Sequence, residues 1–198
     1  EGIAKIQATI LNGRRMSADY CYLKPALKRS NLKIITGAMT EKLIINDDQC
    51  SGVIYKKNNQ IFKVMCNKEV ILSAGAIASP QILELSGVGN PEVLNKNGII
   101  IKHSLSAVGE NFQDHFMARL QWKLKDKKFS YNYRGRGINK YSEMIKYIFA
   151  RKGLFSLPAA SIIAFLKTQE NLETPNIQIQ YIPFSVGSLK KRVFHDFP

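Results

Sequence analysis

The residues best suited to binding chemistry follow a short apolar run at positions 70–72. Four small residues, Ser73, Ala74, Gly75 and Ala76, come directly after it, and main chain without bulky side chains can lie close to a bound molecule. An unbroken apolar run is typical of a strand that is buried on both faces. We therefore expect the small residues at the carboxyl end of a strand, which is where open α/β sheets bind ligands.

A helix is predicted directly after this bend. Ser79 has the side chain of an N-cap and Pro80 suits the first helical position, so the helix is expected over residues 81–85. Gly87 supplies its stop. Because the first amides of a helix lack partners within it, this end favours an anion. The sequence thus predicts a strand, a bend and a helix that together can hold an anionic group.

Other reactive residues carry weaker signals. His115 next to Asp114 has the types needed for proton transfer, but no nucleophile or second base is placed beside them, so we interpret this histidine as structural. Three cysteines cannot all pair, and no Cys-x-x-Cys or Cys/His group has metal-ligand spacing. We accordingly predict no catalytic residue and no metal ligand in this chain. The three cysteines do not decide between an oxidising and a reducing compartment.

Charge is distributed unevenly along the 198 residues, whose formal net charge is +14. Residues 119–152 contain eleven Lys or Arg against two acids, Asp126 and Glu143. Such a block can attract an anionic partner, although a solvated basic face is the simplest interpretation. Aromatic residues are interleaved with it, yet the RNP pattern is absent, so no nucleic acid is expected. The longest apolar run, residues 157–166, is too short for a membrane span.

The elements that position these residues can be predicted from periodicity. Apolar runs at 42–45, 52–56, 61–65 and 70–72 alternate with the turn pairs Asp47-Asp48 and Asn58-Asn59, which predicts an antiparallel meander leading into the strand before the bend. Further expected strands and helices share ordinary start and stop signals. The strands are expected at 4–11, 31–36, 99–102, 160–167 and 176–183, and the helices at 91–97 and 142–149.

Three segments resemble the glucose-methanol-choline (GMC) family of flavin oxidoreductases, and within it the insect glucose dehydrogenases. Residues 68–89, KEVILSAGAIASPQILELSGVG, look like the second signature of the family, and residues 107–115, AVGENFQDH, are similar to its Val-Gly-x-Asn-x-x-Asp-His turn. Residues 12–38 resemble its passage from an Asn-Gly-x-Arg turn to a second strand.

The resemblance implies FAD as cofactor and an α/β (α+β) fold. It implies a partial FAD-binding Rossmann-like domain with an antiparallel meander at residues 1–115, then part of a sheet-based substrate-binding domain at 116–198. The implied cofactor contacts are Thr40, Ala74, Gly75 and Asn111. Thr40 stands where the family usually has a valine whose main chain meets the adenine end of FAD, and a main-chain contact survives that change.

The implied activity is oxidation of a small alcohol or sugar hydroxyl by hydride transfer to the flavin. The chain contains neither the Gly-x-Gly-x-x-Gly turn that opens the family nor its paired catalytic His, so we interpret it as an internal fragment that is inactive alone. The resemblance also points to a secreted parent, although no signal-peptide pattern opens the chain. The alternative is a non-catalytic remnant or binding protein that uses its basic surface for an anionic partner.

Overall fold

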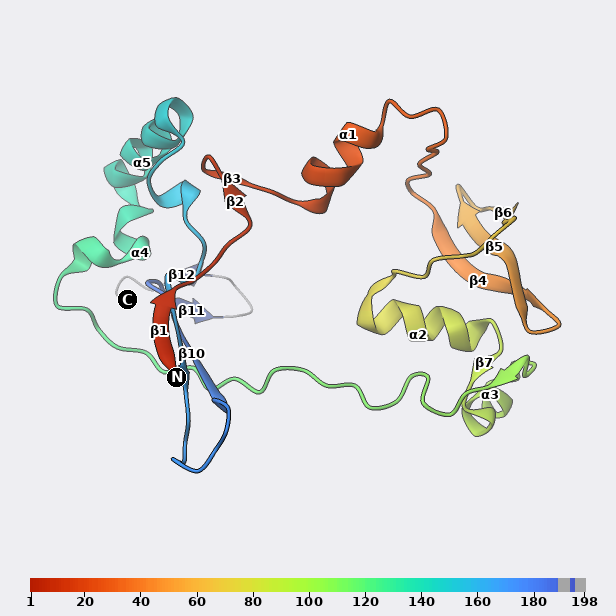
Figure 1. Cartoon of the computed structure of the whole chain (residues 1–198). Coiled ribbons are helices and arrows are strands. Elements are labelled where there is room, and N and C mark those ends of the chain that lie inside the picture. The colour runs from red at the N-terminus through yellow and green to blue at the C-terminus, as the bar shows by residue number, and fades with distance from the viewer. Residues whose placement is uncertain (189–192, 195–198) are drawn as a thin grey trace. The chain divides into compact units, whose positions relative to one another are not determined.

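The computed structural model describes residues 1–188 and 193–194, and it has a mixed α/β fold with antiparallel sheets (Figure 1). The chain forms two compact units. One contains Glu1–Leu32 together with Ala118–Pro198, and the other contains Lys33–Met117. We call them the sheet unit and the meander unit, respectively. The predicted boundary between residues 115 and 116 stays a prediction, and strand pairing joins the first residues of the chain to the sheet unit.

The meander unit is built on a three-stranded antiparallel sheet, as the alternation of apolar runs and turns predicts. Its strands are β4 (Met39–Asn46), β5 (Gln49–Lys57) and β6 (Gln60–Met65), in the order β4-β5-β6. All four residues of the two connecting turns have positive φ, from 47° to 62°. Consecutive left-handed residues suit the twist of a two-residue hairpin, and Asn and Asp tolerate that conformation best. The predicted meander is therefore confirmed.

Helix α2 (Gly75–Leu85) packs along β4 and begins earlier than predicted. Ser79 and Pro80 lie inside the helix rather than at its start, so the predicted N-cap is wrong. The Ser79 Oγ atom instead accepts a hydrogen bond of 3.0 Å from the Ala74 main-chain N–H, one turn back. This bond ties Ala74, which precedes the helix, to Ser79 within it. The predicted stop is correct, since Gly87 follows the last turn with φ +88°.

The strand predicted at residues 70–72 is absent from the described structure, and this prediction is wrong. The segment forms no ladder with any described strand, and the Ile71 side chain is 78% exposed. A β-strand exists only where a neighbour takes up its main-chain hydrogen bonds, and an apolar run by itself provides no such neighbour. The strand predicted at 31–36 is absent from the described residues for the same reason.

The end of the meander unit is a small parallel pair. Strand β7 (Val88–Gly89) pairs with β8 (His103–Ser104), and helix α3 (Pro91–Lys96) connects them. The Asn90 side chain caps α3 by accepting from the Glu92 N–H at 2.9 Å, and Leu94 is fully buried. The predicted helix is confirmed, whereas the predicted strand at 99–102 is displaced to β8.

The sheet unit holds a second three-stranded antiparallel sheet, in the order β1-β9-β10. Its strands are β1 (Gly2–Lys5), β9 (Ile162–Leu166) and β10 (Ile177–Tyr181). The two strands predicted late in the sequence are confirmed. The single strand predicted at 4–11 is divided into β1 and a short hairpin of β2 (Ile10–Leu11) and β3 (Arg14–Arg15).

Six helices and a last strand pair complete the described part of the sheet unit. They are η1 (Asp19–Leu23), α1 (Lys24–Ala26), η2 (Lys127–Phe129), α4 (Tyr131–Arg134), α5 (Gly137–Ala150) and η3 (Leu154–Ser156), and a last strand pair is β11 (Val186–Ser188) with β12 (Val193–Phe194). Helix α5 contains the predicted helix 142–149. Helix α4 is tied to the end of β10, because the Tyr131 N–H donates to the Pro183 carbonyl at 2.7 Å. Within the described residues, no helix has the length and apolar character needed to cross a membrane.

Candidate functional site

The bend before α2 has the backbone geometry that a close main-chain contact requires. Gly75 has φ +94°, a conformation that is strained for any residue with a side chain, and Ala74 immediately precedes the helix. A Cβ atom built on Gly75 would meet no heavy atom within 4 Å. Both residues are exposed. Open space next to an obligatory glycine fits a site where a ligand approaches the backbone.

The chemistry of this bend suits an anion. The Ser79 hydroxyl accepts a hydrogen bond from the Ala74 N–H. The following amides of the first helical turn have no acceptor within the helix. The positive end of the helix dipole lies there too. The residues present therefore fit a pyrophosphate-bearing cofactor, which is the group that the resemblance implies.

Thr40 and Asn111, the other predicted cofactor residues, lie on different elements of the same unit. Thr40 is half-buried in β4, opposite Tyr55 of β5. Asn111 is exposed and has φ +55°, in the extended segment after β8. Near it, Gly109 packs against α2 so closely that a Cβ atom would lie 2.6 Å from the Glu84 Oε1 atom.

The structure anchors these elements at the far end of α2 rather than at the bend. The Leu43 N–H of β4 donates to the Ser86 hydroxyl at 2.8 Å, and the turn around Gly109 contacts Glu84. Glu84 lies nine residues after Gly75, which is about 14 Å along a helix. Ala74 and Gly75 thus lie at the start of α2. The segments that carry Thr40 and Asn111 contact α2 near its end.

The pair Asp114 and His115 does not form a proton relay here. The Asp114 carboxylate accepts a hydrogen bond of 2.7 Å from the main-chain N–H of His115, which is a contact with the backbone and not with the imidazole. The described residues contain no group of three or more His, Cys, Asp or Glu that could hold a metal ion.

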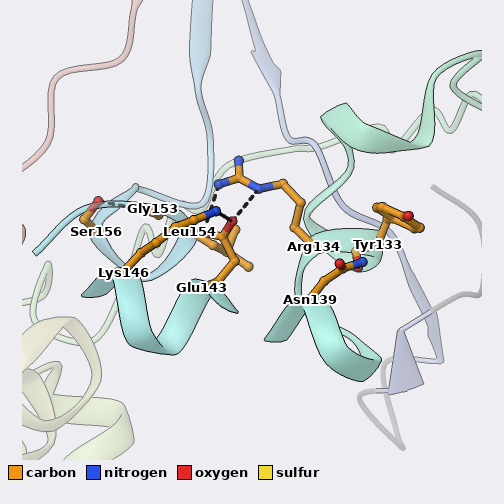
Figure 2. A network of polar contacts seen from close by, with 8 residues as sticks. All are labelled: Tyr133, Arg134, Asn139, Glu143, Lys146, Gly153, Leu154 and Ser156. Atoms are coloured by element: carbon orange, nitrogen blue, oxygen red, sulfur yellow. Dashed lines mark hydrogen bonds and ion pairs between the residues drawn. The ribbon is translucent and has the colours of Figure 1, made fainter. Parts of the chain in front are cut away.

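A buried polar cluster centres on Glu143, and sequence reasoning missed it (Figure 2). Its carboxylate accepts from Arg134 Nε at 3.4 Å and Nη2 at 3.0 Å, from Lys146 Nζ at 3.1 Å and from the Leu154 N–H at 2.6 Å. Only 5% of the residue is exposed. We call these four residues the Glu143 cluster.

The four donors outweigh the burial of the carboxylate. Burial by itself raises the pKa of Glu143, because a charge is costly away from water. The Leu154 N–H, the Arg134 guanidinium and the Lys146 ammonium act in the opposite direction and lower this pKa from 4.5 to about 2. Glu143 is consequently an anion at neutral pH, and it serves as the internal counterion of the basic block.

The Glu143 cluster joins three elements of the sheet unit. Arg134 ends α4, Glu143 and Lys146 lie on α5, and Leu154 begins η3. Gly153 permits the contact with η3, since it has φ +86° and a Cβ atom there would lie 2.5 Å from Glu143 Oε2. The sequence offered one signal for this cluster, which is that Glu143 is one of two acids among the eleven cations of residues 119–152.

Comparison with known proteins places the chain in a family. The family model of GMC oxidoreductases matches residues 1–117. An oxygen-dependent choline dehydrogenase of Photobacterium profundum is 36% identical over 183 residues, which is 92% of this chain and 32% of that protein. The chain belongs to the GMC oxidoreductase family, and it spans about a third of the length of the curated relatives it matches.

Solved structures share the fold at lower identity. Formate oxidase of Aspergillus oryzae superposes with a TM-score of 0.75 at 21% identity, over 89% of this chain and 34% of that one. An FAD-dependent oxidoreductase of Chaetomium thermophilum gives a TM-score of 0.67 at 23% identity, over 83% of this chain and 30% of that one. The family and these flavoprotein neighbours support FAD as the cofactor and the predicted fold class. The resemblance to insect glucose dehydrogenases stays a prediction.

Proposed function

We propose that this chain forms part of the cofactor-binding and substrate-binding regions of an FAD-dependent oxidoreductase that oxidises an alcohol or sugar hydroxyl. Bound FAD would accept the hydride from the alcohol carbon. The observation that carries the proposal is Gly75, whose left-handed backbone opens onto empty space at the start of a helix within the residues that the GMC family model matches.

The role of the meander unit in this proposal is to hold the cofactor. The main chain of Ala74 and Gly75 would contact the pyrophosphate, because the helix end favours a negative charge and no side chain intervenes. Thr40 would contribute a main-chain contact from β4, and Asn111 a polar contact from the turn that follows Gly109. This division of roles places all four predicted residues in one unit.

The role of the sheet unit would be to form part of the wall of the substrate cavity. On one face of its sheet, the register places Gln178 and Gln180 of β10 next to Phe165 and Ile163 of β9. Amide groups beside an aromatic and an aliphatic side chain suit a small molecule that carries hydroxyl groups on a carbon skeleton. The relatives named above act, by their names, on choline and on formate, so the substrate of this chain is proposed at the level of an alcohol or sugar hydroxyl only.

The chain alone is expected to be inactive. None of its residues is proposed as the base that takes the hydroxyl proton, and the family's glycine fingerprint does not occur among its 198 residues. Supplying the purified chain with FAD, an alcohol and an electron-accepting dye should give no alcohol-dependent dye reduction. Substrate-dependent reduction by the chain alone would contradict this part of the proposal.

Cofactor contact is tested separately. Titrating FAD to millimolar concentration into the isotopically labelled chain should shift the amide NMR resonances of Ala74 and Gly75 most, with smaller changes at Thr40 and Asn111. A chain that is folded by its resonance dispersion and shows no shifts at Gly75 would contradict the cofactor role.

A further inference from the structure

A polar hollow of about 220 Å³ lies beside the Glu143 cluster in the sheet unit. Every residue that lines it is charged or polar. They are Lys128, Tyr133, Arg134, Asn139, Ser142, Glu143 and Lys146. Figure 2 shows Tyr133 and Asn139 near the base of Arg134, with Glu143 and Lys146 on the following turns of α5.

The charges of this lining favour an anion. Three cations, Lys128, Arg134 and Lys146, face one carboxylate, so the lining has a formal charge of +2. Glu143 already receives hydrogen bonds from Arg134, Lys146 and the Leu154 N–H. Lysine and arginine side chains can only donate, so an incoming ligand must be rich in acceptors.

The cluster also prepares two of these cations for a ligand. A guanidinium has five N–H donors. Arg134 donates hydrogen bonds from Nε and Nη2 to the Glu143 carboxylate, and these two bonds fix the plane of its guanidinium group. The side chains of Arg134 and Lys146 remain 29% and 55% exposed, so their outer donors reach the hollow. Holding cations in place before binding lowers the entropy cost of the contact.

Lys128 provides the third cation from a different element. It lies in η2, whose start is capped by Asp126: the Asp126 carboxylate accepts the Lys128 N–H at 2.9 Å. The cap fixes the main chain of Lys128 and leaves its ammonium group for the hollow. The lining therefore combines donors from η2, α4 and α5.

We propose that this hollow binds a small phosphate-type anion, either inorganic phosphate or a phosphomonoester group. Its volume equals that of about seven water molecules in the liquid, which accommodates a tetrahedral oxyanion with part of its hydration. The positive lining disfavours a cation. This site belongs to the sheet unit, whereas the bend at Gly75 belongs to the meander unit, and it does not depend on the proposed oxidoreductase activity.

The test uses the 198-residue chain and inorganic phosphate in a chloride buffer of constant ionic strength. Binding is followed by NMR, through the side-chain resonance of Arg134 and the amide resonances of α5. Lys128→Ala removes one cation of the hollow without touching the Glu143 cluster, and Lys140→Ala removes an exposed cation of α5 that does not line it. We expect phosphate to bind about tenfold more weakly to Lys128→Ala and less than twofold more weakly to Lys140→Ala.

Two results would overturn the proposal. One is the absence of any phosphate-dependent shift in the folded wild-type chain at millimolar phosphate. The other is an equal loss of affinity in both lysine variants, because bulk positive charge would then account for the binding. A parallel titration with methyl phosphate identifies the source of the group: tighter binding than inorganic phosphate indicates a phosphomonoester, and equal or weaker binding indicates free phosphate.

Discussion

The bend at Gly75 and the Glu143 cluster represent two opposite ways of building a polar site. At the bend, exposed main chain faces open space, and one hydroxyl, that of Ser79, fixes its start. At the cluster, a buried carboxylate receives four hydrogen bonds from three elements. The first arrangement leaves its main-chain donors for a partner, whereas the second uses four donors to hold a carboxylate within the protein.

The difference shows that strong electrostatic interactions can stabilise the fold without marking a cofactor-binding site. A perturbed pKa marks Glu143, yet its cause is a set of internal contacts that bind helices together. Residues 73–76 of the bend carry no titratable side chain, yet the bend is the better candidate for cofactor contact, because its chemistry lies in the backbone. The following predictions separate the two regions, beginning with the largest expected effect.

Replacing the carboxylate of the cluster should cost the most stability. In Glu143→Gln the buried charge disappears while the Arg134 guanidinium keeps its position, so we expect a loss of about 3 kcal/mol in the free energy of unfolding. Urea denaturation of the chain measures it. Glu170→Gln, at an exposed acid of the same unit, is the control and should change little. A loss below about 0.5 kcal/mol would show that the cluster does not hold the unit together.

Acid should reproduce this loss in the wild-type chain. Because the pKa of Glu143 is lowered from 4.5 to about 2 on folding, its contribution is complete above pH 4.5 and disappears as the pH falls toward 2. A shift of this size corresponds to about 3 kcal/mol. Stability measured against pH should fall more steeply in the wild type than in Glu143→Gln over this interval. Parallel curves would contradict the assignment.

The glycine beside the cluster should be the next most sensitive position. Gly153→Ala adds a Cβ atom 2.5 Å from Glu143 Oε2 at a positive φ, and we expect a loss of about 2 kcal/mol. Gly137→Ala has a positive φ but open space around the new atom, so it reports backbone strain alone. Thermal unfolding compares the two variants. Equal losses would mean that the close contact with Glu143 costs nothing.

The start of α2 should give a smaller effect. Ser79→Ala removes the acceptor of the Ala74 N–H, and we expect a loss of about 1 kcal/mol together with faster hydrogen exchange at residues 74–78. Ser73→Ala, in the exposed segment before the helix, is the matched control. If exchange in the first turn is unchanged in Ser79→Ala, the hydroxyl does not fix the bend.

Local patterns predicted the parts of the fold that depend on neighbours in sequence. Asp47-Asp48 and Asn58-Asn59 predicted the hairpin turns because only a few residue types tolerate positive φ. Gly87 predicted a helix end on the same ground. The apolar run at 70–72 failed as a prediction, because a strand also needs a partner, and an apolar run does not specify one.

The candidate site was predictable where it consists of main chain and unpredictable where it consists of side chains. The small residues at 73–76 marked the bend without any knowledge of tertiary contacts. The Glu143 cluster joins residues that are 9 and 11 positions away from Glu143, on other elements, so no fixed spacing reveals it. The scarcity of acids within a basic block, where Glu143 is one of two, was the only sequence signal. The packing of α4, α5 and η3 against one another had to be known before this signal could be interpreted.

The affinity of the chain for FAD in two glycine variants tests the central claim most directly. Gly75→Ala and Gly37→Ala both place a side chain at positive φ with open space around it, and both lie in the meander unit. If the cofactor contacts the main chain at the bend, Gly75→Ala should weaken FAD binding about tenfold and Gly37→Ala less than twofold. Equal affinities in the two variants would contradict the claim.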